Sequence, residues 1–308
     1  MRVLFAACLL VAAIGVNANA AESKKAGRRP FADHMEGART EVYKRIGDTN
    51  LVVHIFEPPG SVKTNRAAIV FFFGGGWTSG SPGQFEQQCR HFAARGMVAM
   101  SADYRVLSRH GVKPVTCVAD AKSCVRWIRS NATRLGIDPK RIAAGGGSAG
   151  GHVAAATATL PGFDEASEDK SVSFVPNALV LFNPALVLAP MDGVALEGFG
   201  TKVGKERLGA EPGALSPAHH VKAGAPPTII FHGKSDTTVP YFTAEAFAKT
   251  MQKAGNRCDL VGYEGQGHGF FNYGRGDEQY YRETLEAADR FLVSIGYLAK
   301  QKADPARP

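Results

Sequence analysis

Residues 141–151 read RIAAGGGSAGG and contain the pattern G-x-S-x-G, with Ser148 at its centre. The apolar residues at 141–145 predict a short strand before the serine, and the small residues at 149–160 predict a helix after it. A serine between a strand and a helix, with small neighbours that let the backbone bend sharply, is typical of a nucleophile elbow. Such an elbow presents the hydroxyl above the edge of the sheet, so Ser148 is the candidate nucleophile.

The same glycines also allow a second interpretation, a nucleotide-binding loop. Gly145, Gly147 and Gly150 fit the G-x-G-x-x-G pattern of dinucleotide sites. A nicotinamide-dependent oxidoreductase needs a carboxylate at the end of the next strand, and the strand predicted at 178–182 is followed by Asn183-Pro184. A Walker phosphate loop is excluded as well, because no lysine precedes the serine. The sequence therefore favours a nucleophilic serine and predicts no cofactor.

A glycine-rich loop, FGGGW, ends the continuous apolar run at 67–73, which predicts a buried parallel strand. Glycines let the backbone approach a substrate oxygen and point N–H groups toward it. By position, Gly75 and Gly76 in this loop, together with Ala149 after the serine, are the candidate oxyanion donors. Trp77 closes the loop and is a candidate substrate contact, although simple packing explains it equally well.

A serine hydroxyl needs a base, and His268 has the strongest case. It lies in the sequence GQGHG, directly after the strand predicted at 258–263. The base needs an orienting carboxylate, and Asp236 follows the strand predicted at 227–232. The chain order Ser148, Asp236, His268 is the order expected of a hydrolase with a nucleophile elbow.

The remaining histidines fit other roles better. His152 lies one turn past the serine and is predicted to pack on its helix, and His232 ends a strand, where it bonds locally. His219 and His220 are adjacent in the chain, and neighbours rarely face one ion, so no metal site is predicted. Asp259 and Glu264 are the rivals of Asp236 as the carboxylate that orients His268, and both are less well placed.

Taken together, these segments resemble the α/β-hydrolase superfamily and, within it, the hormone-sensitive-lipase-like and acetyl-esterase branch. The resemblance implies an α/β fold: a mostly parallel central sheet with helices on both faces. It also implies hydrolysis of short acyl esters, acetyl above all, by a Ser-His-Asp mechanism. The chain departs from the branch at Phe73, where the usual HGGG motif begins with histidine. The matching segments, in the family's order, are Phe73–Trp77, Asp103–Arg105, Gly136–Pro139, Gly146–Gly151, Gly233–Asp236 and Gly267–Gly269.

Strands and helices alternate over 41–298, which indicates one α/β-hydrolase domain with parallel pairing. The stretch 184–225 breaks this alternation, and it is too long for a plain loop. We interpret it as an insertion that forms a lid or pocket wall; a disordered surface excursion is the alternative. The other predicted elements are strands at 51–56 and 97–104 and helices at 84–95, 114–135, 244–254 and 278–295.

The N-terminal residues carry an export pattern. Arg2 precedes a short apolar run, and Ala18-Asn19-Ala20 is a cleavage site, so residues 1–20 are predicted to be a signal peptide. A polar, basic stretch at 21–40 is predicted to be a flexible leader. We expect a periplasmic or secreted protein without stable membrane insertion, because the apolar run is too short to span a bilayer comfortably.

Charge and cysteine content limit the partners. The chain of 308 residues has a formal net charge of +8, but the basic residues are scattered, so nucleic-acid binding is not expected. Cys117 and Cys124 lie about 10 Å apart along one predicted helix, which is beyond disulfide reach. We expect all the cysteines after the signal peptide to be buried free thiols.

The leading hypothesis is an exported esterase for small-molecule or glycan esters, such as an acetylated polysaccharide. A serine peptidase of the prolyl-oligopeptidase type is the second hypothesis, although the chain is too short to hold a propeller domain as well. A non-catalytic binding module on the same scaffold is the third.

Overall fold

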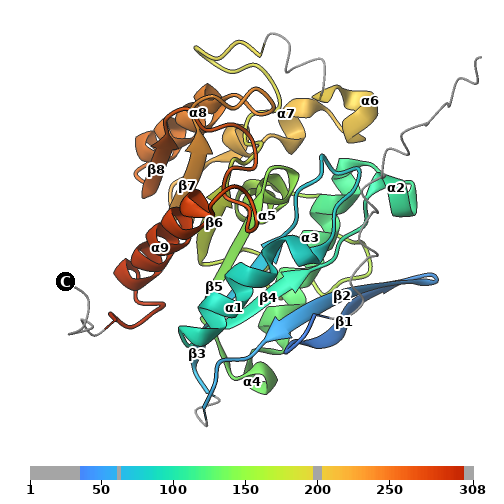
Figure 1. Ribbon diagram of the computed structural model, residues 1–308. Coiled ribbons are helices and arrows are strands. Elements are labelled where there is room, and N and C mark those ends of the chain that lie inside the picture. The colour runs from blue at the N-terminus through green and yellow to red at the C-terminus, as the bar shows by residue number, and fades with distance from the viewer. Residues whose placement is uncertain (1–34, 61–63, 197–202, 302–308) are drawn as a thin grey trace, which may run out of the picture. The chain divides into compact units, whose positions relative to one another are not determined.

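The computed structural model describes residues 35–60, 64–196 and 203–301. Their central feature is an eight-stranded sheet with the order β1-β2-β4-β3-β5-β6-β7-β8 (Figure 1). The pairs β1–β2 and β2–β4 are antiparallel, and every other pair is parallel. The strands are β1 Arg39–Ile46, β2 Thr49–Phe56, β3 Arg66–Phe72, β4 Val98–Ala102, β5 Ile137–Gly147, β6 Ala178–Phe182, β7 Thr228–Gly233 and β8 Cys258–Tyr263.

Helices cover both faces of the sheet, which confirms the predicted fold class (Figure 1). Successive residues of β3 alternate between two cores: Val70 joins the core under α3, α5 and α8, and Phe71 joins the core under α1 and α9. The helices are α1 Glu86–Ala94, α2 Leu107–His110, α3 Pro114–Ser130, α4 Ala132–Leu135, α5 Ala149–Thr159, α6 Lys205–Leu208, α7 Pro212–Leu215, α8 Tyr241–Lys253 and α9 Gln279–Ser294, with 3-10 turns η1 Pro82–Phe85 and η3 Pro217–His220.

The start of the domain corrects the predicted leader. Arg39 and Thr40 already belong to β1 and pair with β2, and Met35 is buried. The strand was missed because its sequence, RTEVYKRI, carries charged residues typical of a sheet edge. The predicted signal peptide and most of the predicted leader lie outside the described residues.

Two other boundaries differ from the sequence prediction. The helix predicted at 114–135 is divided, because Asn131 leaves the helical region (ψ 11°) and bonds through its amide to the carbonyl of Trp127. The strand around the serine is longer than predicted and runs from Ile137 to Gly147. The four described cysteines are buried free thiols, as predicted.

The described part of the 184–225 segment is packed on the domain. Leu186, Leu188 and Ser216 are buried, and the Ser216 hydroxyl accepts the Leu188 N–H at 3.0 Å. The short helices α6 and α7 follow, so this part of the segment has secondary structure of its own. None of the helices formed by the described residues is long and apolar enough to cross a membrane.

Candidate active site

Ser148 lies at the turn between β5 and α5, with φ 55° and ψ −119°. Residues other than glycine rarely adopt this backbone conformation, and backbone strain of this kind is concentrated at functional sites. The flanking positions must be glycine because there is no room for a Cβ atom. A Cβ on Gly146 would lie 2.5 Å from the backbone of Gly150, and a Cβ on Gly150 would lie 2.0 Å from the carbonyl oxygen of Phe72. The small residues of the motif therefore permit the turn that exposes the hydroxyl.

The structure brings Ser148, His268 and Asp236 together. The His268 Nε2 lies 2.9 Å from the Ser148 Oγ, and its Nδ1 lies 2.7 Å from the Asp236 Oδ2. The carboxylate can only accept, so Nδ1 carries the ring proton and Nε2 is left to accept the serine proton. The loop of His268 is held as well, because Arg275 donates to the His268 carbonyl at 2.6 Å.

Asp236 is buried but well supplied with donors. The backbone N–H groups of Thr238 and Val239 donate to its Oδ1 at 2.8 and 2.9 Å. Nε2 of His232 donates to the Val239 carbonyl at 2.8 Å and lies 3.3 Å from the Asp236 Oδ2. Burial alone would raise the pKa of Asp236, but hydrogen bonds from His232, His268 and Val239 outweigh it and hold the pKa well below its usual range. The carboxylate is therefore ionised at neutral pH.

The loop after β3 faces the serine. Gly75 and Gly76 both have positive φ, 126° and 62°, and a Cβ on Gly75 would lie 2.2 Å from the Ser79 carbonyl oxygen. Within the described residues, the N–H groups of Gly75, Gly76 and Ala149 have no protein acceptor. They are therefore available to a substrate oxygen.

Phe73, the departure from the usual motif, supports this loop by stacking. Its ring lies 4.2 Å from that of Tyr104, and the Tyr104 hydroxyl donates to the Phe73 carbonyl at 2.6 Å. Asp103, next to Tyr104, pairs with Arg109 at 2.6 Å. The Asp-Tyr-Arg segment therefore has a structural role.

Trp77, the predicted substrate contact, has a packing role in the structure. Its side chain is only 5% exposed, and its Nε1–H donates to the His152 Nδ1 at 3.2 Å. His152 Nε2 in turn donates to the Leu215 carbonyl at 2.8 Å. The indole thus packs, and it links the glycine loop to α5 and α7. Sequence reasoning placed His152 in helix packing but gave no signal for this link.

One arginine of the 184–225 segment reaches the glycine loop. Arg207 Nη2 donates to the Gly76 carbonyl at 3.1 Å, and its guanidinium lies 5.7 Å from the Trp77 ring centroid. A small cavity of about 190 Å³ lies beside this contact, with walls that include Gly76, Leu107 and Val112. This part of the segment therefore contacts the glycine loop.

The other candidates lie apart from the serine. His219 Nε2 donates to the Pro190 carbonyl at 3.1 Å, and its Nδ1 lies 2.8 Å from the Ser216 hydroxyl. His220 Nε2 donates to the Gly213 carbonyl at 2.9 Å. Asp259 pairs with Arg257, and Glu264 pairs with Lys234. Within the ranges that the structure describes, no group of three metal-ligating side chains occurs.

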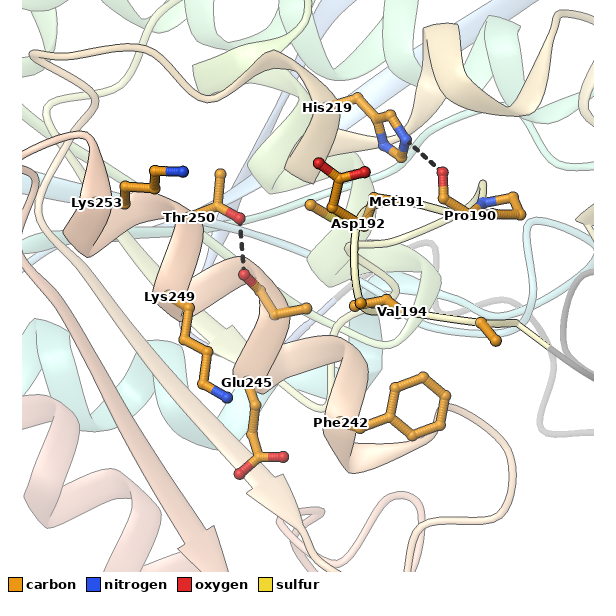
Figure 2. A pocket seen from close by; sticks show the side chains of 13 residues that line it. Pro190, Met191, Asp192, Val194, His219, Phe242, Glu245, Lys249, Thr250 and Lys253 are labelled. Atoms are coloured by element: carbon orange, nitrogen blue, oxygen red, sulfur yellow. Dashed lines mark hydrogen bonds between the residues drawn. The ribbon is translucent and has the colours of Figure 1, made fainter.

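A larger cavity of about 930 Å³ lies between residues 190–195 and α8 (Figure 2). Figure 2 shows Phe242, Glu245 and Lys249 along the helix, and Asp192 and Val194 on the neighbouring segment. None of the residues that line it belongs to the Ser148, His268 and Asp236 group. The size of this cavity therefore does not locate the reacting centre.

Comparison with known proteins agrees with this geometry. A family model described as BD-FAE matches residues 53–251, and a model of the dienelactone hydrolase family matches 209–299. Thermogutta terrifontis esterase 2, solved phosphonylated by sarin, is 53% identical, with a TM-score of 0.84 over 88% of this chain and 99% of that chain. The same esterase bound to propionate is 54% identical, with a TM-score of 0.82 over 87% and 97%.

Curated relatives point to the same class of protein. A probable carboxylic ester hydrolase of Mycobacterium tuberculosis, LipM, is 30% identical over 65% of this chain and 48% of its own length. Esterase LipC of the same organism is 29% identical over 66% and 52%. The chain thus spans about half the length of the curated relatives it matches.

Proposed function

Because the chain belongs to the BD-FAE family of α/β-hydrolases, we propose that it is a serine carboxylic-ester hydrolase. One observation carries the proposal. An unbroken series of hydrogen bonds joins Asp236, His268 and Ser148, beside a loop whose N–H groups are available. A binding module would not need an ionised carboxylate behind a histidine that faces a strained serine.

In the proposed reaction, Ser148 Oγ attacks the ester carbonyl while His268 Nε2 takes its proton. The tetrahedral oxyanion accepts hydrogen bonds from the N–H groups of Gly75, Gly76 and Ala149. His268 then returns the proton to the leaving alcohol, and an acyl-serine remains. Water attacks this ester with His268 again acting as base, so the carboxylic acid leaves and the serine regains its proton. Asp236 holds the tautomer and stabilises the imidazolium.

We further propose a short acyl group, with acetyl as the preferred one. The similar Thermogutta esterase is described bound to propionate and to butyrate, which are short carboxylates.

For the alcohol half and the location, the proposal rests on the sequence. The pattern in residues 1–20 supports export, and an exported short-chain esterase meets acetylated polysaccharide outside the cytoplasm. Intact mass of the protein from the periplasm or medium tests this, with a chain starting at Ala21 expected. An uncleaved chain confined to the cytoplasm would contradict export.

The central test is Ser148→Ala with p-nitrophenyl acetate as substrate. We expect kcat to fall by about 10⁴-fold or more, because the nucleophile is lost. Ser108→Ala, at an exposed serine on α2, is the matched control and should retain full activity. Turnover by Ser148→Ala at the control rate would refute the assignment.

Substrate class is tested with p-nitrophenyl esters of increasing acyl length, followed by acetylated xylan. We expect kcat/KM to be highest for acetate to butyrate and to fall with longer chains. Comparable rates on dipeptide amides would instead favour the peptidase hypothesis.

A further inference from the structure

A series of side-chain amides joins the oxyanion loop to the loop of His268. The Gly74 N–H donates to the Gln84 Oε1 at 2.6 Å. Gln84 Nε2 donates to the Asn272 Oδ1 at 2.9 Å, and Asn272 Nδ2 donates to the Gly269 carbonyl at 2.8 Å. Three hydrogen bonds therefore connect two loops that lie far apart in the sequence and on either side of the nucleophile.

The direction of these bonds is fixed at both ends. At one end the backbone N–H of Gly74 can only donate, so Gln84 must present its oxygen. At the other end the carbonyl of Gly269 can only accept, so Asn272 must present its NH₂ group. The bond between the two side chains then has one possible direction. A carboxylate at either position keeps the shape but lacks the hydrogens that the series needs.

Both ends of the series lie beside reacting groups. Gly74 directly precedes Gly75, and a Cβ on Gly74 would lie 3.4 Å from the Ser148 Cβ, so the loop is pressed against the nucleophile. Gly269 directly follows His268. The connected backbone segments are therefore those that carry an oxyanion donor and the base.

The two amides are supported by packed rings. Phe85, next to Gln84, and Phe271, next to Asn272, are both buried, and their ring centroids lie 5.9 Å apart. On the other side of the base loop, Asn183 Oδ1 accepts the N–H of Gly269 at 3.0 Å. The series is thus anchored in the core, so a displacement of one loop also displaces the other.

We propose that Gln84 and Asn272 are positioning residues that set the separation between the oxyanion donors and the His268 imidazole. The inference rests on the proposed Ser-His-Asp mechanism. In that mechanism the tetrahedral intermediate is held by both loops at once, and a shift of one loop by a fraction of an ångström weakens the transition state more than it weakens the bound ester.

The test uses two isosteric variants, Gln84→Glu and Asn272→Asp, in the full chain. Each adds one negative charge, so the matched controls are Gln87→Glu on α1 and Asn50→Asp on the exposed end of β2. We expect kcat for p-nitrophenyl acetate to fall about 10- to 100-fold in both test variants, with KM changed by less than about threefold. The controls should stay within about twofold of the unmodified enzyme.

A second readout separates positioning from folding. Phosphonylation of Ser148 by a fluorophosphonate should slow in parallel with kcat, because the phosphoryl oxygen enters the same oxyanion site. The double variant should lose little more than either single variant, because one break already interrupts the series. Rates are referred to folded protein measured by circular dichroism. Gln84→Glu removes the donor of the bond to Asn272, and Asn272→Asp removes the donor of the bond to Gly269, so failure of one variant to fold leaves the other as the test.

Control-level kcat and labelling in folded Gln84→Glu and Asn272→Asp would overturn the inference. So would independent, fully additive losses, or a loss that follows the folded fraction alone. Ser148→Ala distinguishes this failure from failure of the proposed function. If Ser148→Ala is inactive while the amide variants are normal, the serine mechanism stands and only the positioning role is wrong.

Discussion

His152 gives a quantitative prediction for stability against pH. Burial lowers its pKa to about 4, against an ordinary value of 6.5. The folded state therefore binds fewer protons than the unfolded state between these values. The stability that the neutral ring contributes is complete above pH 6.5 and is lost as pH falls from 6.5 toward 4. For one such group, this linkage costs about 2 kcal/mol between pH 7.5 and pH 5.

The perturbation is His152→Leu, which removes the titrating group. The variant starts less stable, because the Trp77 N–H and the Leu215 carbonyl lose their partner. The informative quantity is the change with pH rather than the starting value. Urea unfolding at pH 7.5 and pH 5 should show that the wild-type protein loses about 2 kcal/mol more than the variant does. Equal losses in the two proteins would refute the reasoning, since the acid sensitivity would then come from other groups.

Three further predictions concern catalysis. His232→Leu removes a donor beside the Asp236 carboxylate, so the carboxylate holds the His268 imidazolium more tightly. The acid limb of the kcat/KM profile should therefore move to higher pH by up to about one unit. An unchanged profile would contradict this. Asp236→Asn should lower kcat about 10⁴-fold without unfolding the chain, measured by ester turnover and circular dichroism. Gly75→Ala should lower kcat about 100-fold or more, because its Cβ would lie 2.2 Å from the Ser79 carbonyl oxygen. The control is Gly83→Ala, whose Cβ has no neighbour within 3.5 Å, and its kcat should be nearly that of the unmodified enzyme.

Sequence reasoning located the parts of the molecule that depend on local pattern. Ser148, Asp236 and His268 each follow a parallel strand of the sheet, and parallel strands present their carboxyl ends at one edge of a sheet. Their approach to within hydrogen-bonding distance follows from that topology. The α/β fold class could therefore be predicted from the alternation of apolar runs and amphipathic stretches.

What sequence reasoning missed depends on contacts distant in the chain. Nothing local in the sequence shows that the Trp77 N–H meets His152. The contact between Gln84 and Asn272 joins positions 188 residues apart, and amide side chains carry no periodic signal. The strand β1 was hidden because its sequence carries several charged residues and only Tyr43 and Lys44 in it are buried.

The burial of the thiols determines how the fold responds to the redox environment. Burial raises the pKa of the Cys258 thiol to about 12, and it raises those of Cys89, Cys117 and Cys124 above their ordinary value as well. The thiolate is the form that reacts with oxidants and disulfides, so almost none is present at neutral pH. The four described cysteines form no disulfide, so the architecture of the described residues does not depend on an oxidative cross-link. A change of redox environment should leave this architecture unaltered.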